Sequence, residues 1–199
     1  AVVRAALPAA GPGAGEGLRG VRDLVALALL RAGLGPAEVD RGALALGLAE
    51  GPCLAMDREG LDAAQARLGA VAAALGLPGP GPEGPRAGRG GEGAGLPAGV
   101  GATAALHAAL VNAAERMLEA GALARAGDVD LLAVAALGMA RDRGGPLFAA
   151  DDRGLLAVLR DMRALAPLSG PLWAPHPGLE ARVREGQGYF RRAAAISPA

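Results

Sequence analysis

The sequence predicts an all-α protein made of two tandem copies of a small helical domain. Apolar residues recur at spacings of three and four along most segments, which is the period of a helix with one buried face. Glycine and proline residues stop and restart these segments. The same stop signals recur about 90 residues later, a period that suits two copies of one domain and is too long for a solenoid unit. The matched pairs are Ala32-Gly33 with Ala120-Gly121, Val39-Asp40 with Val129-Asp130, Gly51-Pro52 with Gly145-Pro146, and Gly60-Leu61 with Gly154-Leu155.

The first copy is expected over residues 1–78. A flexible spacer is expected at 11–17 because glycine dominates it, and Gly33 and Gly47 stop the helices that follow. Pro36 suits the first position of a helix, where a missing N–H group costs nothing. The expected helices cover residues 18–31, 36–46, a short segment that starts at Pro52, and 61–75.

Residues 79–99 are expected to link the two copies. The segment is almost all glycine and proline with scattered charges, a composition that buries too little apolar area to offset its ordering entropy. A glycine-rich phosphate loop at Gly88 to Gly93 is the alternative interpretation. No predicted strand precedes it and no Gly-Lys-Ser/Thr follows it, so the linker is favoured.

The second copy is expected over residues 100–199. A helix over 104–120 is followed by one over 129–137, for which Asp128 is a suitable N-cap. Gly144-Gly145 form a turn before Pro146 starts another helix. Trp173 is expected to anchor an extended stretch by packing. The remaining expected elements are a helix over 155–165, that extended stretch over 167–177, and a short closing helix over 179–184.

The overall composition excludes several classes of protein. The 199 residues carry 20 basic and 20 acidic side chains, so the net charge is zero and no surface for nucleic acid is expected. No apolar run reaches the ~18 residues of a membrane span, and the first residues lack the order of a secretory signal. The single Cys53 excludes an internal disulfide and is expected to be a small buried residue. These features favour a cytoplasmic protein, and the absence of an initial Met suggests a fragment or a processed chain.

No set of residues in the sequence carries chemistry by itself. His107 and His176 are the only imidazoles, and neither has the spacing of a metal site or a triad, so each is expected to face solvent or to cap a helix. Asn112 is the only Asn, and it is the one candidate for a substrate-proximal position. A structural role, bonding to a neighbouring helix end, is favoured for it. The remaining polar candidates are Asp128, Asp130, Asp151 and Asp152, which are expected to cap helix starts, and Ser169 and Ser197, which have no base nearby in sequence. We therefore expect no catalytic, cofactor-binding or metal-binding residue.

Several of these motifs, taken together, resemble a known family. The motifs are Val111-Asn112-Ala113-Ala114-Glu115-Arg116-Met117-Leu118-Glu119-Ala120-Gly121, Asp128-Val129-Asp130, Leu137-Gly138, Arg143-Gly144-Gly145-Pro146, Asp151 with Gly154-Leu155, Trp173-Ala174-Pro175, Leu179, Gly188-Tyr189-Phe190 and, upstream, Leu29-Leu30-Arg31-Ala32-Gly33, Val39-Asp40, Gly51-Pro52 and Asp57-Arg58-Glu59-Gly60-Leu61-Asp62. With these motifs the chain resembles the C-terminal helical domains of 3-hydroxyacyl-CoA dehydrogenases, as in the multifunctional fatty-acid oxidation enzyme whose alpha subunit joins enoyl-CoA hydratase to the dehydrogenase. They cover most of residues 18–190. The resemblance implies a helical bundle like the C-terminal domain of 6-phosphogluconate dehydrogenase.

The resemblance also implies a function. In the family, a Rossmann domain binds NAD and supplies the catalytic residues, while the helical domains close over the acyl-CoA and provide a dimer-like contact. This chain has no strand-Gly-x-Gly-x-x-Gly-helix unit, so it is expected to bind no cofactor alone, to be inactive alone, and to need a Rossmann partner. The expected function is the C-terminal part of an NAD-dependent 3-hydroxyacyl-CoA dehydrogenase of fatty-acid β-oxidation, with a homo-oligomer possible. The alternatives are a non-catalytic scaffold that binds a partner subunit and an unrelated helical ligand-binding bundle.

Overall fold

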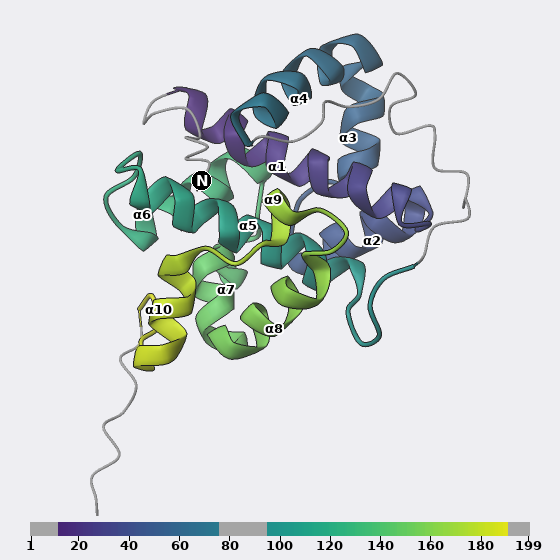
Figure 1. Ribbon diagram of the computed structural model, residues 1–199. Helices are drawn as coiled ribbons and strands as arrows, with labels where there is room; N and C mark the ends of the chain where they lie inside the picture. The colour runs from purple at the N-terminus through teal and green to yellow at the C-terminus, as the bar shows by residue number, and fades with distance from the viewer. Residues whose placement is uncertain (1–11, 76–94, 191–199) are drawn as a thin grey trace, which may run out of the picture.

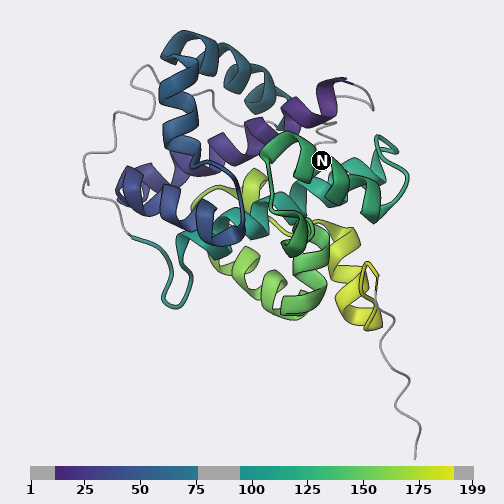
Figure 2. The same cartoon turned by 180° about the vertical axis from the view of Figure 1, so that it is seen from behind.

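The computed structural model describes residues 12–75 and 95–190, and within these ranges it contains helices and no β-strand (Figures 1 and 2). This confirms the all-α prediction. The elements are α1 (Pro12–Arg31), α2 (Pro36–Leu46), α3 (Pro52–Glu59), α4 (Leu61–Leu75), α5 (Ala102–Glu119), α6 (Ala126–Leu137), the 3-10 helix η2 (Arg141–Arg143), α7 (Pro146–Arg153), α8 (Leu155–Leu165), α9 (Gly170–Trp173) and α10 (Pro177–Glu185).

Two long helices, α1 and α5, lie at the centre of the molecule. In both views α3 and α4 lie on one side of this pair, and α7 and α8 lie on the opposite side (Figures 1 and 2). Every residue from Gly20 to Leu27 and from Ala105 to Glu115 is buried. A single apolar core runs through both halves of the chain. None of the described helices combines the length and the apolar character that crossing a membrane requires.

The α-helices α1 to α4 and α5 to α8 share several features, whereas η2, α9 and α10 occur in the second half without a described counterpart in the first. The third helix of each half has eight residues, and it ends at a glycine with positive φ directly before the fourth helix. These glycines are Gly60, with φ of 92°, and Gly154, with φ of 89°, a conformation that L-residues with a Cβ rarely adopt. The packing is reciprocal as well, since α2 lies against α5 and α1 lies against α6.

The predicted spacer at 11–17 is wrong for residues 12–17, which form the first turns of α1. Glycine by itself weakens a helix, but its missing side chain lets another helix approach closely. A Cβ on Gly20 would lie 2.3 Å from Val71 Cγ2 of α4, and one on Gly15 would lie 3.3 Å from Ala136 Cβ of α6. Packing between helices therefore stabilises this end of α1, and the local sequence does not reveal that packing.

Asp128 is not the N-cap of its helix. The helix α6 begins earlier, after Arg125, and Asp128 lies in its first turn, where it pairs with Arg125 at 3.1 Å. This charge pair and the favourable dipole at the helix start explain why an aspartate suits the position without capping it.

The expected extended stretch at 167–177 contains the short helix α9, which is a further correction. Trp173 at the end of α9 is fully buried, which confirms the predicted packing anchor. Cys53 is a buried free thiol, as expected. The predicted closing helix is present as α10.

Most of the expected linker, residues 79–94, lies outside the described residues, and so does the alternative phosphate loop at Gly88 to Gly93. Residues 95–99 return the chain to the core. Gly95 donates its N–H to the carbonyl of Ala32 at 3.0 Å, and Leu96 packs partly buried against the apolar cluster. The division into domains at 1–78 and 100–199 stays a prediction.

Candidate functional site

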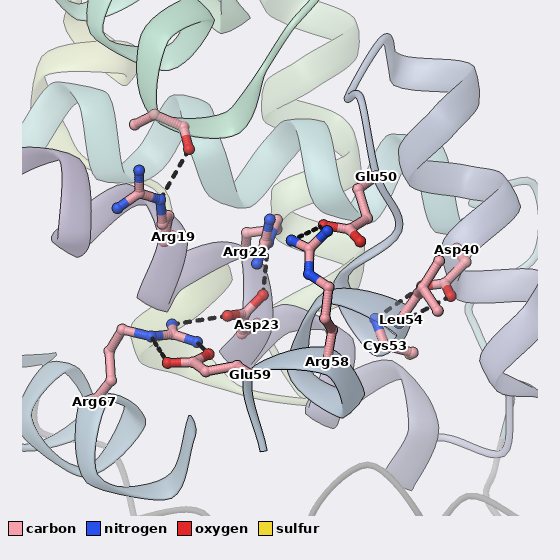
Figure 3. Close-up of polar contacts among 11 residues, drawn as sticks. Arg19, Arg22, Asp23, Asp40, Glu50, Cys53, Leu54, Arg58, Glu59 and Arg67 are labelled. Atoms are coloured by element: carbon pink, nitrogen blue, oxygen red, sulfur yellow. Dashed lines mark hydrogen bonds and ion pairs between the residues drawn. The ribbon is translucent and has the colours of Figure 1, made fainter. Parts of the chain in front are cut away.

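Two aspartates cap helices that begin further along the chain. Asp40 on α2 accepts hydrogen bonds from the N–H groups of Cys53 and Leu54, at 2.8 and 3.2 Å, at the start of α3 (Figure 3). Asp130 on α6 accepts two equivalent bonds at the start of α7, at 2.8 and 2.9 Å. Because the first N–H groups of a helix have no partner within it, each carboxylate satisfies two donors at once. The expectation that Asp130 caps the start of its own helix is wrong, because it lies within α6 and caps α7 instead.

The glycines before these helices are part of the same device. A Cβ on Gly51 would lie 2.2 Å from Asp40 Cγ, and a Cβ on Gly145 would lie 2.4 Å from Asp130 Cγ. Each carboxylate therefore occupies the space of the missing side chain. In each half, the Asp of the recurring Val-Asp pair contacts the Gly of the recurring Gly-Pro pair. Burial raises the pKa of Asp130, against the lowering effect of the two N–H groups that it accepts from.

A network of charges, buried at Asp23 and exposed at Glu59, joins α1, α3 and α4 in the first half. Asp23 is fully buried, with Arg22 Nε 2.6 Å from one carboxylate oxygen and Arg67 Nη1 2.8 Å from the other (Figure 3). Arg67 also donates from Nε to Glu59 at 3.1 Å. Burial raises the pKa of Asp23, although both arginines oppose the shift. The second contact, between Asp23 and Arg67, has the distance of an ion pair without the angle of a hydrogen bond.

In the second half an ion pair of opposite polarity joins α7 to α8. Glu59 ends α3 and pairs with Arg67 of α4, whereas Arg153 ends α7 and pairs with the buried Asp161 of α8. Both pairs span eight residues across the glycine between the two helices. Sequence reasoning missed them because the two residues of each pair lie on different helices and no motif links them.

Asn112 lies in the buried face of α5, and its amide is bonded to the C-terminal segment. Its Nδ2 donates to the carbonyls of Leu172 and Ala174, both at 2.9 Å, and its Oδ1 accepts the N–H of His176 at 2.9 Å. The side chain is 1% exposed. These bonds favour the structural interpretation of Asn112 over direct contact with a substrate.

Glu115, one turn further along α5, is the centre of a second buried polar cluster. One of its oxygens accepts from Arg182 Nε at 3.0 Å and from the Tyr189 hydroxyl at 2.6 Å. The guanidinium of Arg182 also lies 4.6 Å from the centre of the Tyr189 ring. Burial raises the pKa of the Tyr189 phenol, and the nearby Glu115 carboxylate adds to the shift. Glu115 was not singled out from the sequence, since a lone helical glutamate carries no recognisable signal.

The C-terminal segment has two further polar attachments. Asp151 on α7 accepts the N–H groups of Tyr189 and Phe190, both at 2.8 Å. The expectation that Asp151 caps a helix start is therefore wrong, because it lies near the end of α7 and binds the segment that follows α10 instead. The ring of Phe190 packs at a tilt against Phe148, with the ring centres 6.2 Å apart. Trp173 donates its indole N–H to the Ala105 carbonyl at 2.9 Å.

The two histidines lie in different environments. His107 is buried on α5, with Nε2 2.9 Å from the carbonyl of Pro146, and burial lowers its pKa. The expectation that it faces solvent or caps a helix is wrong, since a backbone carbonyl satisfies the ring inside the core. His176 is the N-cap of α10, which agrees with the capping interpretation.

The thiol of Cys53 is not activated as a nucleophile. Burial raises the pKa of the Cys53 thiol to about 12, with the nearby Asp40 adding to the effect, so the thiol stays protonated at neutral pH. Ser169 precedes α9 without a side-chain capping bond, and Ser197 lies outside the described residues. In the described part of the chain, no group of three His, Cys, Asp or Glu residues is arranged to hold a metal ion. What the buried polar groups do is join helices to one another.

No protein-family profile matches this chain, and no curated protein matches it in sequence.

Proposed function

We propose that the chain is the C-terminal helical part of an NAD-dependent 3-hydroxyacyl-CoA dehydrogenase of fatty-acid β-oxidation. The observation that carries the proposal is the capping device, because it occurs at both places where the sequence motifs of that family recur. Asp40 with Gly51 and Asp130 with Gly145 form the same contact between the second and third helices of each half. These two contacts support the proposal because both are made by residues of the motifs that carry the resemblance.

The same observations support a tandem duplication of one small helical domain. The order of helices, the glycine between the third and fourth helices, and the ion pair across it all recur. The reciprocal packing of α2 on α5 and of α1 on α6 is what a twofold relation between the copies requires. In this proposal the two copies form inside one chain the dimer-like contact of the family, in a helical bundle like the C-terminal domain of 6-phosphogluconate dehydrogenase.

The proposed division of labour assigns NAD and catalysis to a Rossmann partner domain or subunit. This chain closes over the acyl-CoA that the partner also holds, and the complex is a cytoplasmic enzyme. In this proposal Asn112 does not touch the acyl-CoA itself. Its bonds to the carbonyls of Leu172 and Ala174 position the segment that follows α8. Homo-oligomers of the complete enzyme are compatible with this arrangement.

A non-catalytic scaffold is the second candidate. It is favoured by the way the buried polar groups Asn112, Glu115 and Asp130 are used within the chain, which suits a rigid surface for a partner subunit. The two helical domains would then be retained only for binding that partner subunit.

The test separates these two functions. Calorimetric titration of the isolated chain with NAD should give no measurable heat of binding, and the chain alone should not oxidise 3-hydroxyacyl-CoA. Addition of a Rossmann domain from a 3-hydroxyacyl-CoA dehydrogenase in trans should restore turnover. NAD binding by the chain alone would overturn the division of roles. Binding of the added domain without turnover would favour the scaffold.

A further inference from the structure

The imidazole of His176 is placed between a helix start and two carboxylates. As the N-cap of α10 it accepts the N–H of Gly178 at Nδ1, over 3.2 Å. Its Nε2 lies 3.0 Å from a carboxylate oxygen of Glu119. A ring that accepts this bond at Nδ1 is the neutral tautomer with its proton on Nε2, and that proton can be donated to Glu119.

A second partner for Nδ1 is already in place. Glu115 Oε2 lies 4.0 Å from Nδ1, and both side chains are nearly buried, at 5% and 10% exposed. The other oxygen of Glu115 is occupied by Arg182 and Tyr189. A protonated Nδ1 can no longer accept from Gly178, but it can donate to this oxygen.

The other charged groups around the ring do not remove the preference of a protonated Nδ1 for Glu115. The helix α5 contributes Glu115 and Glu119, and α10 contributes Arg182, which is paired with Glu115. Tyr189 is bonded to the same glutamate, and α9 has no titratable side chain. On the outer face, Glu180 of α10 pairs with Arg163 of α8 at 2.9 Å. The ring therefore faces two carboxylates, one at each nitrogen.

We propose that His176 is a proton-operated cap: the neutral ring caps α10 through the N–H of Gly178, and the protonated ring releases that N–H and forms an ion pair with Glu115. The proton comes from solvent and is held on Nδ1, and no bond other than hydrogen bonds changes. The start of α10 then loses its side-chain cap. The ion pair between His176 and Glu115 attaches the C-terminal segment to α5 in its place.

The experiment measures the Gly178 amide directly. Hydrogen-exchange NMR gives its protection factor, which corrects for the intrinsic effect of pH on exchange, and the ring nitrogens of the two histidines report protonation. As the ring of His176 protonates, protection of Gly178 should fall roughly fivefold, the factor that corresponds to losing a helix cap. His107, buried against Pro146, serves as the internal control for the ring signals.

Two variants test the separate steps. In His176→Asn the side chain still caps but does not titrate, so protection of Gly178 should become independent of pH. In Glu115→Gln the anionic partner is lost, so the Gly178 bond should persist at pH values where the wild type has released it. The burial of Trp173, followed by its fluorescence, verifies that each variant is folded. The proposal is overturned if Gly178 protection is unchanged when the ring protonates, or if Glu115→Gln responds as the wild type does.

Discussion

Removal of the carboxylate that caps α7 should be among the most destabilising single substitutions in the contact between α6 and α7. In Asp130→Ala, two N–H groups lose their acceptor. The N–H of Leu147 is buried, so leaving it unpaired costs about 1–3 kcal/mol, and the N–H of Phe148, which is only partly buried, adds about 0.5–1 kcal/mol. The variant no longer buries a charge, which offsets part of the loss. We expect a net destabilisation of about 2–3 kcal/mol.

The first half supplies a matched control. Asp40→Ala removes the same kind of cap from α3, but there the donors are partly buried or exposed, so water can replace the carboxylate. That variant should lose only about 1 kcal/mol, the usual cost of an exposed cap. Urea unfolding, with equal slopes for all variants, gives both free energies. Equal losses for the two variants would refute the assignment of the larger effect to burial at α7.

Three further predictions concern other buried contacts. Gly20→Ala places a Cβ 2.3 Å from a valine methyl of α4 and should cost about 1–3 kcal/mol in urea unfolding, whereas Gly69→Ala, with no atom within 4 Å, should be neutral or stabilising. Asn112→Ala leaves three backbone groups without their partner and should cost about 3 kcal/mol; a red shift of Trp173 fluorescence before global unfolding would locate the loss, and an unshifted spectrum would contradict it. Burial raises the pKa of Asp23 against the effect of two neighbouring arginines, so the stability linked to its proton is present below about pH 3.9 and is lost as pH rises through the raised pKa. The stability of the wild type relative to Asp23→Asn should therefore fall with rising pH in that window, and a rise in its place would show that the arginines dominate.

The helices were predictable from the sequence where a local signal marks them. Proline at the first position and glycine after the last residue define α2 within the sequence itself, and the structure has the same bounds. The start of α1 carried the opposite local signal, because its glycines serve contacts with α4 and α6 that only the folded chain brings together. A rule based on propensity alone places a spacer there.

The polar contacts were predictable only in part, for a related reason. The repeat identified Asp130 as important but not the helix that it caps, since the partner N–H groups lie 17 and 18 residues away. The charges of Asp23 and Arg67 match no motif, the motif that contains Glu115 does not mark it as buried, and their burial depends on how whole helices pack. A composition with 20 acids and 20 bases does not indicate which of them pair.

The reversed polarity of the two ion pairs, between α3 and α4 and between α7 and α8, has a consequence for how the chain finds its fold. A protein with two halves of similar shape can place the fourth helix of one half in the socket of the other. With α4 in the place of α8, Arg67 would meet Arg153, and with α8 in the place of α4, Asp161 would meet Glu59. Each exchange sets like charges against one another, with the residue of the fourth helix partly or fully buried and the residue of the third helix exposed, which is unfavourable. Because the two pairs have opposite signs, α3 forms a favourable ion pair only with α4, and α7 only with α8.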